Sequence, residues 1–214
     1  MIQRLKHHLM AKSRSKKIRE FISLTGDDKD STILDVGAAN KEYSPYDNPL
    51  EKIYTYPAKI TALSIYPLDE FSERYPEIRA VNYTGGKFPF NDNEFSVVFS
   101  NAVVEHVGGF EKQLKFVNEM YRVGRQLYFT TPAREFPLEM HTSLPLIHWL
   151  PKQIFNRVAI LFGKGWAAGD YMNLLTKSKL IELMRESHVK EYKIFTHRLG
   201  FFPLHYTVWG RKKN

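Results

Sequence analysis

The hydrophobic positions of the chain fall into short blocks with two different spacings. Apolar residues three or four positions apart predict amphipathic helices, whereas short runs of Val, Ile and Leu predict buried strands. Because the two kinds of block alternate, the pattern predicts an α/β protein with a doubly wound, mostly parallel sheet. Strands are predicted at residues 32–36, 60–65, 78–81, 97–99 and 126–131, and helices at residues 2–24 (one helix or two short ones), 67–74, 111–123 and 178–187.

The end of the chain follows a different pattern. Residues 189–197 and 205–211 alternate as two strands, and the link between them contains Gly200 and Pro203. Two alternating strands with a short connection are typical of an antiparallel hairpin. We therefore expect the parallel sheet to be followed by a C-terminal hairpin.

Residues 132–172 interrupt the alternation of helices and strands and are rich in Pro, Trp, Phe and His. A long excursion of this kind is more often a lid or a binding surface than a plain loop. The expected organisation is one domain over residues 1–214, with a helical lid that binds the acceptor at residues 133–171.

Within this lid, residues 144–166 combine Leu, Ile, Trp and Phe with Lys152, Arg157 and Lys164. A surface helix that touches lipid or a hydrophobic acceptor has this composition. Packing of the lid over the sheet accounts for the same residues and is the favoured interpretation.

A tight turn is predicted within Ser31–Asn40, whose sequence is STILDVGAAN. The apolar run ends in small residues at Gly37, Ala38 and Ala39, which allow backbone N–H groups to approach a ligand closely. Asp35 at the strand end is placed to meet a cation or a polar group. An ordinary strand-to-helix turn has the same pattern, so this segment alone does not define a site.

Composition narrows the class of protein. The 214 residues are 43% hydrophobic and 25% charged, which suits a globular domain with a substantial core. Cysteine is absent, which excludes disulfides, thiolate nucleophiles and Cys-based metal sites. No apolar stretch approaches the roughly 18 residues of a membrane span, and the N-terminus lacks the apolar core of a signal peptide. A cytoplasmic protein is expected.

The net charge of +8 is concentrated at the N-terminus, because residues 1–24 carry seven basic groups and one acidic group. A basic arm of this kind can meet nucleic acid or an anionic membrane surface. A solvated helix face that aids solubility is the favoured interpretation. The oligomeric state is not predicted.

The chain resembles the class I S-adenosylmethionine-dependent methyltransferases, specifically the type-11 methyltransferase family. The resemblance rests on LDVGAAN at Leu34–Asn40, on KFPFNDNEFSVVFSNAVVEHV at Lys87–Val107, which is the most specific, and on the helix through Glu119–Val123. Thr130–Pro151 (TTPAREFPLEMHTSLPLIHWLP) is also similar to a bacterial subgroup with a TPNR-like element and a Pro/His-rich insertion. The resemblance covers about residues 30–212. It implies a seven-stranded, Rossmann-like methyltransferase fold.

The resemblance also implies a cofactor, S-adenosyl-L-methionine, and a set of residues around it. Its methionine and ribose portions would lie along the turn after the first strand, its methionine end would face the end of the fourth strand, and its adenine would lie near a phenylalanine. In that order, the residues are Asp35, Gly37, Ala38 and Ala39, then Ser100, Asn101 and Ala102, and finally Phe88.

Three positions depart from the family pattern. Lys41 stands where the third glycine of the family's loop is expected, and Ala39 where the second is expected. Ser64 occupies the position of the acid that accepts from the ribose hydroxyls, and Thr84 that of the Asp near the adenine amino group. Losing two acidic anchors can cost several kcal/mol if the groups go unpaired. Weak cofactor affinity, a shifted binding mode and a lost activity are the alternatives.

His106 is the candidate catalytic residue, because it follows Glu105 where the family's active site opens. A histidine titrates near neutrality and can deprotonate or orient a hydroxyl acceptor. The alternative is a histidine bonded to a backbone carbonyl. Residues of the insertion that are predicted to meet the acceptor are Arg134, Glu139, His141, Asp170 and Tyr171, with His148 also a candidate, and no metal is predicted. A helix N-cap is the favoured interpretation of Asp170-Tyr171, and Arg134 alternatively pairs with Glu135 or Glu139.

The sequence therefore predicts methyl transfer from S-adenosylmethionine to an oxygen, nitrogen or carbon of a small or lipid-linked acceptor. One alternative is a binding protein that retains the methyltransferase fold without turnover, which Ser64 and Thr84 favour. A further alternative is an RNA methyltransferase that uses the basic arm; it is less favoured, because no Asn/Asp-Pro-Pro-Tyr-type motif is present.

Overall fold

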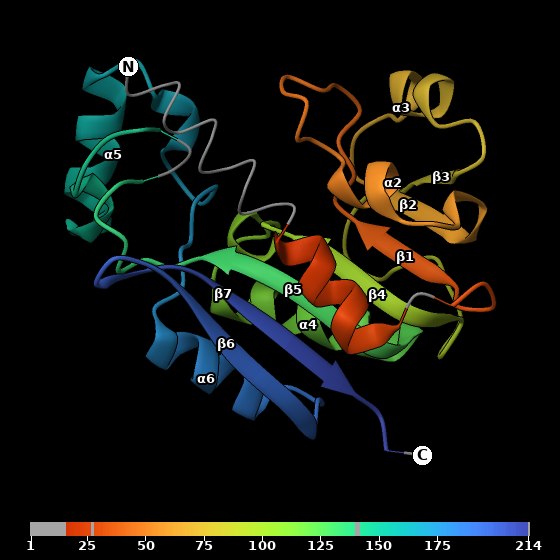
Figure 1. Cartoon of the computed structure of the whole chain (residues 1–214). Helices are drawn as coiled ribbons and strands as arrows, with labels where there is room; N and C mark the ends of the chain where they lie inside the picture. The colour runs from red at the N-terminus through yellow and green to blue at the C-terminus, as the bar shows by residue number, and fades with distance from the viewer. Residues whose placement is uncertain (1–15, 27, 140–141, 214) are drawn as a thin grey trace. The chain divides into compact units, whose positions relative to one another are not determined.

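The computed structural model describes residues 16–26, 28–139 and 142–213. Its seven strands form one sheet in the order β3-β2-β1-β4-β5-β7-β6 (Figure 1). β1 pairs in parallel with both β2 and β4, β2 pairs in parallel with β3, and β6 pairs with β7 antiparallel. The predicted α/β fold with a C-terminal hairpin is confirmed. The strands are β1 (Ile33–Val36), β2 (Ile60–Ser64), β3 (Arg79–Asn82), β4 (Phe95–Asn101), β5 (Gly124–Pro132), β6 (Glu191–Leu199) and β7 (Phe202–Arg211).

The helices match the predicted periodicity, with short additions. The α-helices after the one at residues 16–25 are α2 (Pro49–Ile53), α3 (Asp69–Arg74), α4 (Phe110–Val123), α5 (Lys152–Leu161) and α6 (Lys177–Glu186). Single 3₁₀ turns lie at η1 (Pro57–Lys59), η2 (Val104–His106), η3 (Ile147–Trp149) and η4 (Gly165–Ala167). No helix of the described residues is long and apolar enough to cross a membrane.

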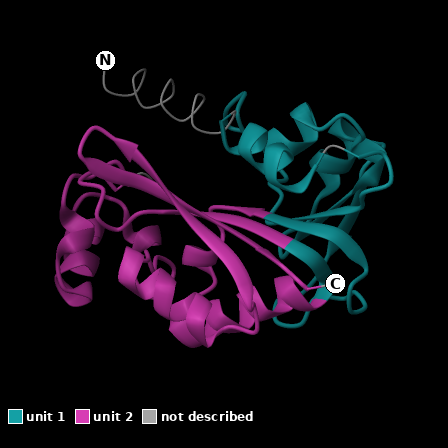
Figure 2. Ribbon diagram, turned by 60° about the horizontal axis from the view of Figure 1, so that its bottom comes forward, with its two compact units in different colours: residues 1–99, 123–126 teal, residues 100–122, 127–214 magenta. Residues whose placement is uncertain are grey.

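The chain divides into two compact units (Figure 2). Unit 1 comprises residues 1–99 and 123–126, and unit 2 comprises residues 100–122 and 127–214.

Unit 1 has a core of β-branched and aromatic side chains. Every residue of β1 and β2 is buried, as expected for parallel strands that are covered on both faces. The helix at residues 16–25 contributes Ile18 and Phe21 to the core, and the Phe21 ring lies edge-on to Phe99 with centroids 5.0 Å apart. This helix is the described part of the predicted basic arm. Residues 1–15 lie outside the described residues.

Unit 2 is built around α4, the β6–β7 hairpin and α6. The buried face of α4 includes Val117 and Met120, as its amphipathic pattern predicts. The hairpin pairs Glu191 with Arg211 and continues to Leu199 and Phe202, with an irregularity between His197 and Arg198. At the start of α6 the Thr176 side chain accepts a hydrogen bond from the Lys179 N–H at 3.2 Å, an N-cap that ends the preceding loop.

The predicted lid at residues 133–171 contains η3, α5 and η4, so its expected helical character is borne out by the elements. Phe155 and Ala159 of α5 pack with Ala167 and Met172 in a small cluster. The favoured interpretation, that the apolar residues of this segment are packed, holds only for that strip. Several other large apolar side chains of the same segment are exposed, among them Leu161 at 81% and Phe162 at 60%.

Candidate functional site

The turn after β1 is held by an asparagine that sequence reasoning missed. Gly37 has a φ of +98°, a conformation that favours glycine, and its N–H donates to the Leu63 carbonyl at 2.8 Å. Asn48 then fixes the loop, because its Oδ1 accepts from the Ala39 N–H at 2.9 Å and its Nδ2 donates to the Ala39 carbonyl at 2.8 Å. Gly37 and Ala39 are exposed, whereas Ala38 is buried. This loop therefore keeps its shape without the third glycine, whose place is taken by Lys41, which pairs with Glu70 at 3.3 Å.

Two buried carboxyl groups lie beside this turn. Asp35 at the end of β1 and Glu51 on α2 are each 6% exposed, and no salt bridge reaches either of them among the described residues. The two side chains are close enough to share a hydrogen bond when one of the carboxyl groups is protonated. Burial, followed by the Coulombic repulsion of Glu51, raises the pKa of Asp35 well above its usual range, and burial also raises the pKa of Glu51. The pair is suited to meeting positive charge.

Ser64 and Thr84, which occupy positions where the family has acidic residues, differ in their environment. Ser64, at the end of β2, is buried, and its Oγ accepts from the Tyr66 N–H at 3.2 Å. Its carbonyl accepts from the Asn82 side chain at 3.0 Å. Thr84 is exposed. Both side chains are therefore uncharged.

Phe88 was expected near the adenine, but its side chain is enclosed by protein. The residue is 1% exposed, and its ring lies edge-on to Tyr83 with centroids 5.6 Å apart. Ile65 and Tyr66, which follow β2 directly, are exposed large apolar side chains of unit 1.

In unit 2 the end of β4 carries the segment that was expected to face the methionine end. Ser100 is buried, and Asn101 Oδ1 accepts from the Thr130 hydroxyl at 2.8 Å. Ala102 has a φ of +59°, an unusual conformation for alanine, and its N–H donates to the Thr130 carbonyl at 2.9 Å. Strained residues of this kind concentrate at functional sites.

His106 lies beside a buried carboxylate. Its Nδ1 is 3.2 Å from the Tyr171 carbonyl, which can only accept, so Nδ1 carries the proton. Its Nε2 is 3.9 Å from Oε1 of the buried Glu105, whose Oε2 accepts from the Thr131 hydroxyl at 3.0 Å. The Tyr171 ring lies against the imidazole with centroids 4.7 Å apart. The backbone contact of His106 does not prevent it from acting as a base, because that contact uses Nδ1. Nε2 lies on the opposite edge of the ring, toward Glu105.

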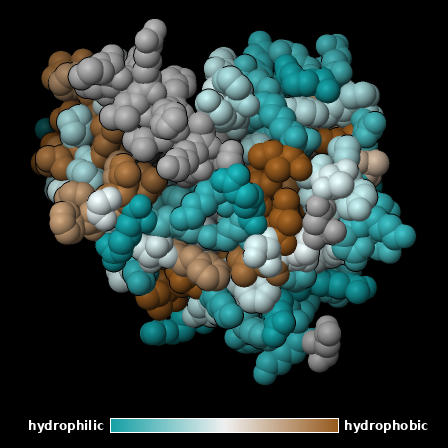
Figure 3. All heavy atoms as spheres, in the orientation of Figure 1, coloured by the Kyte–Doolittle hydropathy of each residue, from teal (hydrophilic) through white to brown (hydrophobic). Residues whose placement is uncertain are grey.

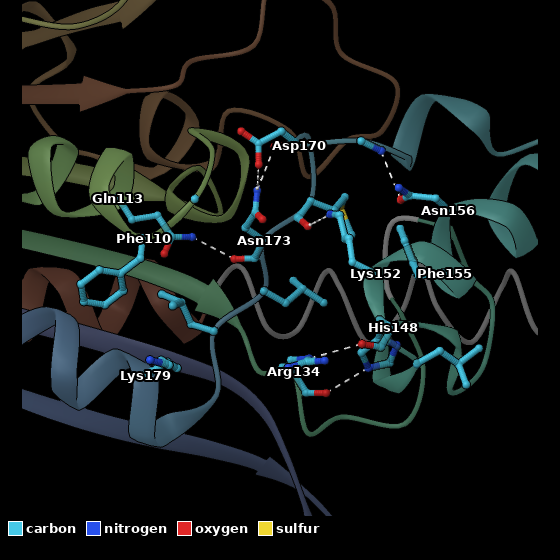
Figure 4. Close-up of a pocket in the computed structure, with 16 residues that line it drawn as sticks. Phe110, Gln113, Arg134, His148, Lys152, Phe155, Asn156, Asp170, Asn173 and Lys179 are labelled. Atoms are coloured by element: carbon cyan, nitrogen blue, oxygen red, sulfur yellow. Dashed lines mark hydrogen bonds between the residues drawn. The ribbon is translucent and has the colours of Figure 1, made fainter.

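A cavity of about 560 Å³ opens in unit 2 between α4, α5 and the segment after η4 (Figure 4). One wall is attached to η2: the Asn173 N–H donates to the Glu105 carbonyl at 2.9 Å, and Gln113 Nε2 donates to the Asn173 carbonyl at 2.9 Å. The polar lining residues include Gln113, Arg134, His148, Lys152, Asp170 and Asn173, and the apolar ones include Phe110, Leu150, Phe155, Met172, Leu174 and Leu175.

Positive charge dominates the polar lining. Arg134 Nε donates to the His148 carbonyl at 3.3 Å, and Lys152 Nζ donates to the Met172 carbonyl at 2.6 Å. Burial lowers the pKa of Lys152, and the positive charge of Arg134 lowers it further, although Asp170 acts in the opposite direction. The Asp170 carboxylate is 3.5 Å from Lys112, so its charge is partly balanced from outside the cavity.

His148 contributes a neutral imidazole to the lining. Its Nε2 lies 3.0 Å from the Arg134 carbonyl and 2.9 Å from the Phe136 carbonyl, so Nε2 carries the proton. Burial lowers the pKa of this histidine. Nδ1 is buried and has no hydrogen-bond partner among the described residues, which makes it an acceptor for a ligand's donor group.

The residues that the sequence predicts to meet the acceptor therefore do not all lie at the same place. Arg134 and Asp170 line the cavity, whereas Tyr171 lies on His106. Glu139 is buried within a turn, where its carboxylate accepts from the Thr142 N–H, and it is not part of the described lining. His141 lies outside the described residues. Within the part of the chain that is described, no group of three or more His, Asp or Glu residues is placed to hold a metal ion.

Comparison with known proteins supports the resemblance. Residues 34–126 match the family model described as a methyltransferase domain. A search of curated proteins gave no match. An S-adenosylmethionine-dependent methyltransferase from Thermotoga maritima is 16% identical, with a TM-score of 0.59, and the alignment covers 98% of this chain and 92% of that one.

Two further solved structures show the same fold. A methyltransferase of the same kind from Methanosarcina mazei is 15% identical (TM-score 0.55; 86% of this chain, 93% of that one). Geranyl diphosphate C-methyltransferase from Streptomyces coelicolor, in complex with S-adenosyl-L-homocysteine, is 10% identical (TM-score 0.58; 92% and 78%). The chain therefore has the fold of the class I S-adenosylmethionine-dependent methyltransferases, and its residues 34–126 are similar to a methyltransferase domain. This similarity supports S-adenosyl-L-methionine as the cofactor.

The residues of unit 1 fit this cofactor. S-adenosylmethionine carries a sulfonium and an ammonium group, and a buried acidic pair with raised pKa values is stabilised by positive charge. The exposed turn at Gly37 and Ala39 leaves backbone accessible, and Ile65 and Tyr66 offer apolar surface to a base.

Proposed function

We propose that this protein transfers a methyl group from S-adenosylmethionine to an acceptor that combines an anionic group with an apolar portion. The observation that carries the proposal is the cavity of unit 2, whose lining combines the cations Arg134 and Lys152 with large apolar side chains and several further polar residues. Small-molecule sites likewise combine apolar walls with polar groups that fix the orientation of the ligand.

The anionic group of the acceptor would bind beside Arg134 and Lys152. Lys152 is partly desolvated and near a second cation, so it is held in an environment that disfavours its charge. An anion bound between the two residues would remove this penalty. Carboxylates and phosphates match the guanidinium geometry of Arg134 through paired hydrogen bonds.

The apolar portion would contact Phe110, Phe155 and Met172, and His148 Nδ1 would accept a hydrogen bond from a hydroxyl or amine of the acceptor. Because an unpartnered buried acceptor costs about 1–3 kcal/mol, a ligand that donates to it is favoured over one that does not. Amphiphilic acceptors, including lipid-linked ones, satisfy these requirements.

His106 is proposed as the base. With Nδ1–H bonded to the Tyr171 carbonyl, the neutral ring presents Nε2 as its proton acceptor. Glu105 at 3.9 Å would stabilise the imidazolium that results, and Thr131 holds the other oxygen of Glu105 in place. When bound, S-adenosylmethionine supplies an electrophilic methyl group on a sulfonium. Nε2 of His106 would take the proton of the acceptor atom that receives this methyl group.

Cofactor binding is the first test. Calorimetric titration with S-adenosylmethionine and S-adenosylhomocysteine is expected to give micromolar binding to the folded protein. An absence of binding to both would instead favour a binding protein that keeps the fold without turnover.

The base is tested with His106→Ala. This change is expected to leave cofactor affinity unaltered and to reduce turnover by about 10²–10⁴-fold, the usual contribution of general base catalysis. The matched variant Tyr171→Phe keeps both the carbonyl that holds Nδ1 and the aromatic ring, so it should retain turnover. Unchanged turnover in His106→Ala would overturn the assignment.

The acceptor class is tested with hexyl phosphate, hexanoate and hexanol as probes of the cavity. The two anions are expected to bind and the alcohol to bind at least about tenfold more weakly. Arg134→Gln and Lys152→Gln should remove this preference, whereas Lys87→Gln, an exposed lysine of unit 1, should retain it. Equal binding of all three probes would contradict an anionic acceptor.

A further inference from the structure

We propose that unit 2 docks on an anionic lipid bilayer through an apolar surface around α5. We call this the α5 surface. In Figure 3 brown atoms gather over α5, on the left of the view. The surface consists of the exposed large apolar residues Leu146, Trp149, Leu150, Ile154, Ile160, Leu161, Phe162 and Trp166.

The α5 surface is not needed for packing within unit 2. α5 buries only Phe155 and Ala159, which meet Ala167 and Met172. The chain then turns at Gly163, whose φ is +68°, and the Lys164 N–H closes the turn on the Ala159 carbonyl at 2.7 Å. This turn leaves Leu161 and Phe162 at 81% and 60% exposure, so the most apolar part of the segment faces solvent. Exposed apolar patches of this kind mark interaction surfaces.

Charge identifies a bilayer as the occupant. No Asp or Glu occurs between Glu139 and Asp170, while Lys152, Arg157 and Lys164 all lie within that stretch. An amphipathic helix with basic residues beside Leu, Phe and Trp is typical of binding in the interfacial layer of a membrane. Basic residues near an anionic lipid surface are attracted to it.

The same charges disfavour a second copy of this chain on the α5 surface. A two-fold contact places each patch against itself. Arg157 and Lys164 of both copies would then approach each other with no acidic residue of the segment to balance them. The aromatic residues fit the bilayer instead: Trp149 Nε1 donates inward to the Arg134 carbonyl at 2.7 Å while the residue remains 45% exposed.

Docking would also orient the cavity. Leu150, Lys152, Phe155 and Asn156 of the same segment line the cavity, so a membrane that covers the α5 surface lies beside that lining. An amphiphilic acceptor could then enter from the lipid. The docking proposal itself does not depend on methyl transfer and is tested without it.

Vesicle co-sedimentation tests the proposal with the full-length protein. We expect binding to phosphatidylcholine vesicles that contain about 30 mol% phosphatidylglycerol, and much weaker binding to pure phosphatidylcholine. Raising the salt from roughly 0.1 M to 0.5 M should weaken the binding, because surface charges are screened. A failure to bind the anionic vesicles at low salt would overturn the proposal.

Variants locate the surface. The double change Leu161→Ser and Phe162→Ser should reduce vesicle binding at least about tenfold, since it removes two apolar side chains that would enter the lipid. Phe201→Ser, at an equally accessible residue (94% exposed) next to the hairpin turn, is the matched control and should bind as the parent does. Arg157→Gln with Lys164→Gln should remove the preference for anionic vesicles, whereas Lys59→Gln with Lys87→Gln should not. Equal loss in control and test variants would overturn the assignment.

Tryptophan fluorescence gives an independent readout. Two of the three tryptophans, Trp149 and Trp166, belong to the α5 surface, whereas Trp209 is buried. Vesicles should therefore shift the emission to the blue, and brominated lipids should quench it. Trp149→Phe with Trp166→Phe should abolish both effects. Light scattering tests the alternative that the surface joins two copies. The proposal would be overturned if the parent did not bind vesicles and formed a dimer that the double change Leu161→Ser and Phe162→Ser converted to monomer.

Discussion

Asp35 and Glu51 hold two carboxyl groups together away from water, and the cost of this arrangement depends on pH. Their raised pKa values mean that the folded state binds more protons than the unfolded chain between the ordinary carboxyl pKa and the folded one. The free energy of unfolding therefore falls as pH rises through that window. A ligand with positive charge would offset this loss, which is the role that we propose for the cofactor at this pair.

Glu51→Gln should consequently stabilise the free protein at high pH. At pH 8 we expect the free energy of unfolding to rise by roughly 1–3 kcal/mol, the cost of an uncompensated buried polar group. Near pH 4 the gain should largely vanish, because both carboxyls are then protonated in the folded state. Urea denaturation at the two pH values measures the difference. Glu70→Gln, at an exposed ion pair with Lys41, should change stability by less than about 0.5 kcal/mol at either pH. A gain independent of pH would contradict the interpretation.

The left-handed conformation of Ala102 makes a second prediction at this scale. Ala102→Gly removes a strain of about 1–2 kcal/mol and adds flexibility to the unfolded chain worth about 0.4–1 kcal/mol, so a net gain of up to about 1 kcal/mol is expected. Ala102→Val should cost stability, because a β-branched residue tolerates positive φ poorly. Ala168→Gly is the control: its φ is −75°, so glycine there should only destabilise. Thermal unfolding distinguishes them, and the same sign for both glycine changes would refute the strain.

At the scale of elements, one glycine of the hairpin in unit 2 lies where there is no room for a side chain. A Cβ at Gly210 of β7 would lie 2.7 Å from Val189 Cγ1 and 3.3 Å from the Glu191 carbonyl oxygen. The Val189 side chain can shift, but the backbone oxygen cannot move without disturbing the β6–β7 pairing. A residue without a side chain therefore allows the strands and the following loop to pack.

Gly210→Ala should lower the free energy of unfolding by about 1–3 kcal/mol, the usual cost of overpacking. This loss exceeds the roughly 0.4–1 kcal/mol that alanine gains through the unfolded state. Gly109→Ala is the matched control, because an added Cβ there meets no atom within 4 Å. Chemical denaturation of both variants measures the effect, and equal stability of the two would show that the contact at Gly210 relaxes freely.

For the whole molecule, the sequence predicts the regular elements well because their signals are local. β2, β5 and β7 begin and end within a few residues of the predicted bounds, since each is a continuous or alternating apolar run. α2 has only five residues and depends on tertiary burial of Leu50, so no periodicity could indicate it.

The candidate site was less predictable, because its contacts join residues that are distant in the sequence. The Asp35–Glu51 pair, the hold of Asn48 on Ala39 and the approach of Tyr171 to His106 leave no spacing signal. The exposure of the apolar residues of α5 was not predicted for a different reason. Composition cannot distinguish an apolar helix that packs from one that faces solvent, because only the surrounding chain decides which face is covered.

The residues that we propose for the cofactor and those that we propose for the acceptor belong to different units of the molecule. Asp35 and Glu51 belong to unit 1, Arg134 and Lys152 belong to unit 2, and the two pairs share no described partner. Glu51→Gln should weaken the binding of S-adenosylmethionine, because it removes one carboxyl group of the acidic pair that we propose meets the positive charge of the cofactor, and should leave hexyl phosphate binding unchanged. Arg134→Gln should have the opposite pattern.

The double variant Glu51→Gln with Arg134→Gln should show both losses, additive within about 0.5 kcal/mol as expected of independent sites. Calorimetry with each ligand on the four proteins completes the cycle. If Glu51→Gln also weakened hexyl phosphate binding, or the losses departed strongly from additivity, cofactor and acceptor would be coupled through a shared structural change. The charge of each pair would then no longer account for the affinity at its own site.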